Sequence, residues 1–148
     1  MTPTTRTDPF LAGNFRVEID GITTTSFSEI SGLEAEIDVV DYRTGDERED
    51  TVRKLPGLRK FTNIVLKRGM VPDTSLWNWI DSALKGNVVR AAMKITLLDQ
   101  AENPVWSWNI RQAWPCKWTG PVLVAKSSDV AIETLEICHE GFEMAAAG

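Results

Sequence analysis

The chain has 148 residues, of which 43% are hydrophobic and 25% are charged, and its formal net charge is −5. This composition is typical of one soluble globular domain and excludes a chain that is disordered throughout. The acidic balance argues against nucleic-acid recognition through the phosphate backbone. The apolar runs are far shorter than the roughly 20 residues that cross a bilayer, so we expect no membrane anchor.

The first 13 residues differ from the rest of the chain. They are rich in threonine, contain two prolines and end in a glycine. This pattern predicts an N-terminal arm over residues 1–13, followed by a single β domain over residues 14–148. Phe10 and Leu11 are apolar residues in this otherwise polar arm, and we expect them to dock on the chain itself or on a neighbour. The polar start predicts no classical secretory signal.

Alternating patterns predict strands in the first third of the chain. Residues 15–19 alternate apolar and polar side chains, as in a half-buried strand, and residues 22–31 contain several β-branched residues. The clearest strand covers residues 33–42. Its apolar face carries Leu33, Ala35, Ile37 and Val39, and its acidic outer face, which must meet bulk water or a wet channel, carries Glu34, Glu36 and Asp38.

A charged loop is predicted over residues 43–58. Eight of the twelve residues from 43 to 54 are charged, four of each sign. The sequence Leu55-Pro56-Gly57-Leu58 then places proline and glycine where a type II turn requires them. Residues 59–67 return to the apolar pattern of a strand.

One helix is predicted over residues 73–85. The sequence Pro72-Asp73-Thr74 is typical of a helix start, and Gly86 stands where a helix usually ends. The predicted buried face has apolar residues at helical spacing, namely Leu76, Ile80, Ala83 and Leu84.

The second half of the chain predicts further strands. Residues 88–98 and 105–114 have strand patterns joined by a hairpin loop, while residues 115–121 look irregular. A short strand is predicted at residues 122–124 and a long final strand at residues 130–142. With seven or eight strands and one helix, the chain is predicted to be mainly β, an antiparallel β-sandwich or barrel with one flanking α-helix.

Tryptophan is unusually frequent, with six residues against one tyrosine. Trp77 and Trp79 lie about 200° apart around the helix axis, so at least one must be partly exposed or lie in an interface. Trp106 and Trp108 share one face of a strand. For this second pair a core aromatic ladder, a subunit interface and a platform for stacking carbohydrate all remain open.

The sequence has no recognisable pattern of a catalytic or metal site. A single histidine, His139, excludes a histidine-based metal site within one chain, and the two cysteines lack metal-ligand spacing. Phosphate-binding glycine loops and serine nucleophile motifs are absent, and the many carboxylate pairs are not specific to glycosidases. We therefore expect a non-enzymatic protein without cofactor or metal. Cys116 and Cys138 are expected to be free thiols, with Cys138 as a small core residue.

Five segments, in chain order, resemble one family. They are Phe15–Gly21, Ser31-Gly32-Leu33-Glu34, the block KLPGLRKFTNIVLKRG at residues 54–69, Leu76–Ile80 and Ala131–Phe142. Together they span nearly the whole chain. They resemble the inner tube proteins of contractile phage tails and of phage-tail-like contractile injection systems.

The resemblance implies a hexameric ring in which one sheet of each subunit joins a continuous β-barrel around a lumen. Rings would stack into a tube inside a contractile sheath, and sheath contraction would drive the tube into a target cell. The implied partners are further copies of the chain, a sheath protein, baseplate and cap proteins, and any cargo in the lumen. The particle would assemble in the producer cytoplasm and act as a phage tail, or as an extracellular or cell-bound machine.

Three groups of residues become candidates for assembly in such a tube. The acidic residues Glu34, Glu36 and Asp38 are candidates for the lumen, with a surface facing outward as the plain alternative. Trp77 and Trp79 are candidate interface aromatics. The candidates for ring-to-ring contacts, where paired charges fix the register and where a solvated loop is the alternative, are Phe10, Leu11, Asp46, Glu47, Arg48, Glu49, Asp50 and Arg53.

Two other functions remain open at this point. One is a specialised paralogue in the same machine, such as the ring that initiates the tube at the baseplate. The other is a carbohydrate-binding β-sandwich that stacks sugars on its tryptophans. The lack of a secretory signal and the single tyrosine weigh against the second function.

Overall fold

The computed structural model describes residues 8–22, 26–43, 45 and 52–146. Strands dominate these residues, with one helix, which confirms the predicted mainly-β fold with a single α-helix. The elements are β1 (Phe15–Ile19), β2 (Glu29–Ser31), β3 (Ala35–Tyr42), β4 (Arg53–Phe61), β5 (Ile64–Gly69), α1 (Ser75–Leu84), β6 (Ala91–Leu98), β7 (Pro104–Thr119), β8 (Ile132–Cys138) and β9 (Phe142–Ala146).

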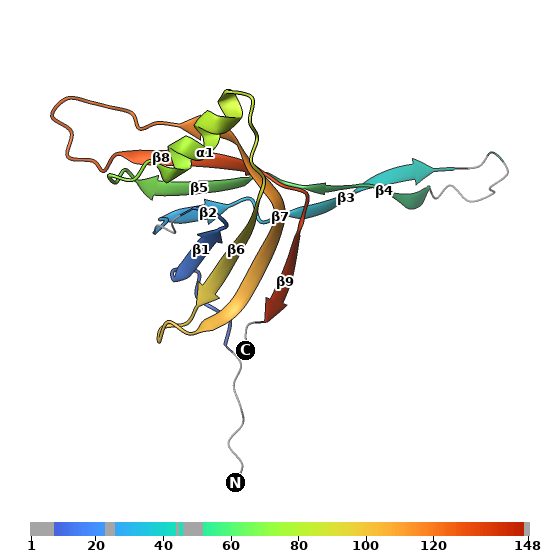
Figure 1. Cartoon of the computed structure of the whole chain (residues 1–148). Helices are drawn as coiled ribbons and strands as arrows, with labels where there is room; N and C mark the ends of the chain where they lie inside the picture. The colour runs from blue at the N-terminus through green and yellow to red at the C-terminus, as the bar shows by residue number, and fades with distance from the viewer. Residues whose placement is uncertain (1–7, 23–25, 44, 46–51, 147–148) are drawn as a thin grey trace, which may run out of the picture.

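Strand β7 belongs to two sheets at once. Its first part pairs with β6 on one side and β9 on the other, and its last part pairs with β8. The strand order is β1-β6-β7-β8-β5-β2, with β9 beside β7, and every pairing is antiparallel. Figure 1 shows the long β7 curving from one sheet into the other. We call β1, β6, the first part of β7 and β9 the four-stranded sheet.

The bend in β7 is built from bulges. Between Ile110 and Ala113 the strand has one residue more than β6 opposite it, and Gln112 there adopts a left-handed φ of 52°. The prediction of irregular structure over residues 115–121 was wrong, because β7 continues through Pro115 to Thr119. Among the described residues this last part of β7 pairs only with β8, and a strand with an unpaired edge and a bulge tolerates a proline.

Two predicted strands are each divided in the structure. The strand predicted at residues 130–142 ends at Cys138 and restarts at Phe142, because Gly141 turns the chain with a φ of 128°. The strand predicted at residues 59–67 is split at Thr62 and Asn63. Residues 122–124, predicted as a short strand, lie in an exposed loop.

Strands β3 and β4 form a separate hairpin that projects from the body (Figure 1). The charged loop predicted over residues 43–58 is therefore too long, since β4 begins at Arg53. The turn predicted around Pro56 and Gly57 is part of this strand, where the register shifts between Ile37 and Val39 opposite. The apolar face predicted for residues 33–42 is exposed beyond Leu33, because no second layer covers the hairpin among the described residues.

The helix packs one face on the body, and it is shorter than predicted. Leu76, Trp79 and Ile80 are buried, whereas Leu84, predicted on the buried face, is exposed at the last turn. Trp79 donates from Nε1 to the carbonyl oxygen of Val89 at 2.8 Å. Trp77 stays 40% exposed and packs edge-on against Trp118, which confirms that the two tryptophans do not share one environment.

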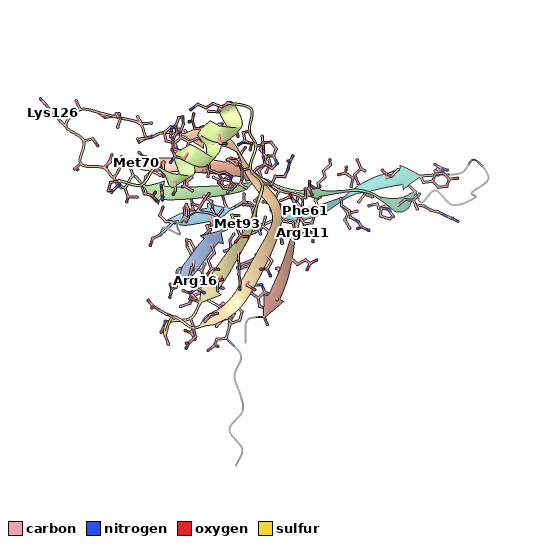
Figure 2. The ribbon with its side chains drawn as sticks, in the orientation of Figure 1. Arg16, Phe61, Met70, Met93, Arg111 and Lys126 are labelled. Carbon is pink, nitrogen blue, oxygen red and sulfur yellow. The ribbon has the colours of Figure 1, made fainter. Side chains whose placement is uncertain are left out.

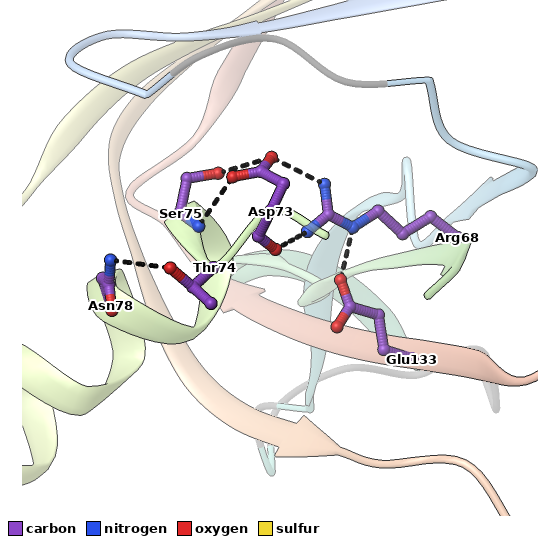
Figure 3. Close-up of polar contacts among 6 residues, drawn as sticks. All are labelled: Arg68, Asp73, Thr74, Ser75, Asn78 and Glu133. Carbon is purple, nitrogen blue, oxygen red and sulfur yellow. Dashed lines mark hydrogen bonds and ion pairs between the residues drawn. The ribbon is translucent and has the colours of Figure 1, made fainter. Parts of the chain in front are cut away.

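A buried arginine ties the start of the helix to the sheet (Figure 3). Arg68 of β5 is 1% exposed and pairs through Nε with Glu133 of β8. Its other nitrogens reach Asp73, at 3.3 Å to the carboxylate and 3.1 Å to the carbonyl oxygen. Asp73 in turn accepts hydrogen bonds from the backbone N–H and hydroxyl of Ser75, and these bonds, followed by Arg68, lower the pKa of its carboxyl.

A second polar cluster holds the base of the hairpin. His139 donates from Nε2 to the carbonyl oxygen of Thr62 at 2.9 Å and accepts at Nδ1 from the N–H of Gly141 at 3.1 Å. Phe61, labelled in Figure 2, packs its ring against His139 and Phe142, with ring centroids 5.8 and 5.3 Å away. The end of β4 is thus fixed to the turn between β8 and β9.

We predict that Arg68→Met lowers the free energy of unfolding by about 3–5 kcal/mol, because it leaves Glu133 buried without its cation. The double variant Arg68→Met with Glu133→Leu should recover most of this loss, since no buried charge is left. Urea unfolding of the three proteins measures both quantities. Equal stability of the single variant and the wild type would contradict the role of this pair.

We predict that His139→Ala lowers the free energy of unfolding by about 1–2 kcal/mol, since Thr62 and Gly141 each lose a hydrogen-bond partner. The neighbouring Glu140→Ala is the matched control, because its side chain is exposed and its change should stay within about 0.5 kcal/mol. The comparison uses urea unfolding at neutral pH. Indistinguishable unfolding midpoints for the two variants would show that His139 does not stabilise the hairpin base.

Candidate functional site

The face of the four-stranded sheet that points away from the core is polar. Along each strand, core residues such as Val17, Met93 and Ile110 alternate with exposed polar ones. Two ion pairs lie on this face, Arg16 with Glu18 and Arg111 with Glu143, each at 3.1 Å. Arg16 and Arg111 are labelled in Figure 2. The exposed polar residues of the face are Arg16, Glu18, Lys94, Asn109, Arg111 and Glu143.

Both outer edges of this sheet are open in the described part of the chain. Apart from an isolated bridge between Ile19 and Ile22, β1 pairs only with β6, and β9 pairs only with β7. Since the four strands alternate in direction, β1 and β9 run antiparallel to each other. The β1 edge of one copy can therefore pair with the β9 edge of another and continue the same antiparallel sheet.

The hairpin presents apolar side chains to solvent. Leu58 is 74% exposed and Val39 is 62% exposed, although both lie within strands. A group of exposed apolar side chains on one projecting hairpin is typical of an interaction surface. We call this set, which is divided between the two faces of the hairpin, the hairpin patch; its members are Ile37, Val39, Val40, Tyr42, Leu55 and Leu58.

The residues predicted to face a lumen lie on or next to β3, not on the four-stranded sheet. Glu34 accepts a hydrogen bond from the Thr62 hydroxyl at 3.1 Å, at the base of the hairpin. Glu36 lies opposite Lys60, and Asp38 pairs with the Lys60 ammonium at 2.9 Å. The bond to Asp38 raises the pKa of Lys60. Their place in a lumen stays a prediction.

The structure describes part of the predicted ring-to-ring set. Phe10 and Leu11 are exposed, and the Phe10 ring lies 6.2 Å from that of Trp106, so the arm rests on its own chain. Arg53 begins β4 opposite Tyr42. Residues 1–7 of the arm and the charged residues Asp46, Glu47, Arg48, Glu49 and Asp50 lie outside the described residues.

Most of these tryptophans make their contacts within the subunit. Trp79 is buried, so of the two candidate interface aromatics only Trp77 reaches the surface. Trp108 is partly buried and packs against the core, and Trp106 contacts Phe10. This arrangement favours the core ladder over a flat carbohydrate platform.

An apolar loop follows β7 and was not recognised as a surface in the sequence. Val122, Leu123 and Val124 are among the most exposed apolar residues of the described chain. Figure 2 labels Lys126 at the far end of this loop and Met70 beside it, on the side of the body opposite the hairpin. A run of three apolar residues without alternation also fits a short buried strand, so the local pattern holds no signal that identifies this exposed loop.

The described residues contain no group of three or more His, Cys, Asp or Glu side chains placed to hold a metal ion. Over the same residues the helix is too short to cross a membrane. The surfaces that stand out are therefore the open sheet edges, the polar sheet face, the hairpin patch and the apolar loop.

The chain matches a known protein family over most of its length. Residues 11–143 match the family model described as T4-like virus tail tube protein gp19. No curated protein sequence matches the chain.

Three solved structures are similar over nearly their whole length. A chain from the PVC extracellular contractile injection system, in its extended sheath-tube complex, has 29% identity and a TM-score of 0.85, covering 94% of this chain and 93% of that one. A chain from the anti-feeding prophage baseplate has 27% identity and a TM-score of 0.84, covering 95% and 97%. A chain from the anti-feeding prophage cap has 25% identity and a TM-score of 0.87, covering 99% and 97%.

A family match over this length, on a fold whose four-stranded sheet has two open edges, identifies the chain as a member of the T4-like virus tail tube protein family.

Proposed function

We propose that this protein is the tube subunit of a contractile injection system, which forms hexameric rings that stack into an inner tube. Sheath contraction then propels this tube into a target cell. The relatives of similar structure come from a sheath-tube complex, a baseplate and a cap. The corresponding partners of this chain are further copies of itself, a sheath protein, and baseplate and cap proteins. Its place is in a phage-tail-like particle.

The observation that carries this proposal is the four-stranded sheet with two open edges of compatible direction. Unpaired strand edges are a hazard for a protein that acts alone, and closure of a ring pairs both outer edges of the four-stranded sheet. Pairing β1 of each subunit with β9 of the next produces one barrel that runs around the ring.

In such a ring the polar face of the sheet lines the lumen. The core face of the same strands is already covered by α1 and by the second sheet, which consists of the last part of β7, β8, β5 and β2. This face therefore cannot line a water-filled lumen. The opposite face carries both charge signs, with three basic and two acidic residues among its exposed positions, and it tolerates a wet channel. Glu34, Glu36 and Asp38 then lie near the hairpin base, at a rim of the channel or between subunits.

The hairpin patch contacts a second copy of the chain. Its apolar side chains are exposed in the subunit, and a neighbouring copy supplies the layer that would cover them. The exposed side of Phe10 and Leu11 and the charged residues 46–50 and 53 add contacts between successive rings. Because the two ends of a ring differ, such contacts stack rings head to tail into an open filament.

The role is structural and not catalytic. Enzyme sites are concave and combine convergent polar groups with shifted pKa values. Here the side chains that stand out are apolar groups on a projecting hairpin and a loop, together with spread charges on an open sheet face. These features suit a surface that binds further protein copies, with the tube lumen available for cargo.

Native mass spectrometry and negative-stain electron microscopy of the purified chain test the proposal. We expect six-fold rings or stacked tubes, and a species near six times the 16.5 kDa of one chain. A protein that stays monomeric at every concentration, including in the presence of preformed tube ends, would contradict it.

We predict that Leu58→Asp abolishes rings and tubes while leaving the stability of the monomer within about 0.5 kcal/mol, since the side chain is exposed in the subunit. A carboxylate desolvated against the neighbouring copy opposes assembly. The matched control is Leu84→Asp, at 69% exposure on α1, which should still assemble. Size-exclusion chromatography with electron microscopy reports assembly, and normal rings from Leu58→Asp would show that the hairpin patch is not an interface.

A further inference from the structure

The two cysteines, far apart in the sequence, lie on adjacent strands. In the ladder between β7 and β8, Trp114 pairs with Cys138, Pro115 with Ile137 and Lys117 with Glu136. Cys116 is therefore the extra residue of a bulge, and it is exposed, while Cys138 is partly buried. The expectation that Cys138 is a core residue is thus only partly met, since the buried face of β8 carries Glu133, Leu135 and Ile137 instead.

Contacts around Cys116 place its sulfur on the same side of β8 as Cys138. The thiol donates to the carbonyl oxygen of Glu136 at 3.5 Å and to the Glu136 carboxylate at 3.7 Å. In β8, Glu136 and Cys138 share one face because they are two residues apart. Cys138 therefore lies next to Cys116 across the ladder, and after burial it contributes most to raising the pKa of the Cys116 thiol.

We propose that Cys116 and Cys138 form a dithiol site that reacts with a small-molecule disulfide and closes to an intramolecular disulfide between β7 and β8. One thiolate attacks the external disulfide and releases the first small thiol. The second protein thiol loses its proton to solvent, attacks the mixed disulfide and releases the second small thiol. Two protein thiols are oxidised to one disulfide, and one external disulfide is reduced to two thiols.

The surroundings make this reaction slow at neutral pH. Burial, followed by the neighbouring Cys138 and Glu136, raises the pKa of the Cys116 thiol to about 12. Since the thiolate is the reactive form, the closure rate should keep rising through pH 8–10, where a free cysteine with a pKa of about 8.5 levels off. A reducing cytosol therefore leaves both residues as thiols, and an oxidising medium closes the bond.

The disulfide would reinforce the body beside the hairpin base. Asn63, which links β4 to β5, donates from its side chain to the Glu136 carboxylate at 3.3 Å and to the Cys116 sulfur at 3.8 Å. In Figure 1 the β3-β4 hairpin projects from the body at a point close to β7 and β8. A bond between β7 and β8 at this point ties together the strands that anchor the hairpin, whatever the assembled state.

The test is incubation of the full chain with oxidised glutathione at pH 9 under native conditions, followed by acid quench and intact mass analysis. We expect a loss of about two mass units for the two hydrogens removed, a peptide that joins residues 116 and 138, and an apparent Tm raised on the order of 10 °C. Cys116→Ser and Cys138→Ser should each instead retain one glutathione adduct.

A second thiol placed elsewhere on the same face is the matched control. Cys138→Ser combined with Ile132→Cys moves the thiol six residues along β8, beyond the reach of Cys116, and should give two glutathione adducts and no internal bond. Two adducts on the wild-type chain would overturn the proposal. Disulfide-linked dimers, or closure only after denaturation in urea, would overturn it as well.

Discussion

The whole subunit depends on one strand that serves two sheets. In its first part β7 holds β6 and β9, and in its last part it holds β8, while α1 packs across it. A strand can change sheets only by bending, and the bend uses a bulge with a left-handed Gln112. The second bulge, at Cys116, turns a thiol toward β8 and creates the dithiol pair. The sheet edges, the hairpin base and the cysteine site all follow from the path of this strand.

The polar groups inside the subunit fix orientation more than they add stability. A buried ion pair has a desolvation cost comparable to its attraction, so Arg68 and Glu133 are better understood as setting where α1 begins. His139 has an analogous role, because its two ring nitrogens join the end of β4 to the turn before β9. Both clusters hold projecting elements in place relative to a core that consists mainly of aliphatic side chains.

In the isolated subunit the core residues are covered, but some strand edges and apolar surface residues are not. The buried cluster is complete, yet the two outer edges of the four-stranded sheet and the hairpin patch remain uncovered in the described chain. The apolar loop after β7 adds a further exposed surface on the opposite side of the body. Ring closure pairs the edges, and stacking covers the patch, so the physical need for partners and membership in a tube family lead to the same interpretation.

The sequence by itself determined the mainly-β class, the single helix and the family. The alternation at residues 15–19 and the helix signals around residues 73–86 are local patterns, and the structure contains both elements. The tertiary structure decided which faces are covered. Residues 33–42 alternate like a half-buried strand, but the hairpin leaves the core, so Ile37 and Val39 are exposed within the subunit. Nor does spacing reveal that Cys116 and Cys138 lie on paired strands, because their proximity comes from a strand ladder and a bulge. Strand pairing brings together residues that no sequence window contains.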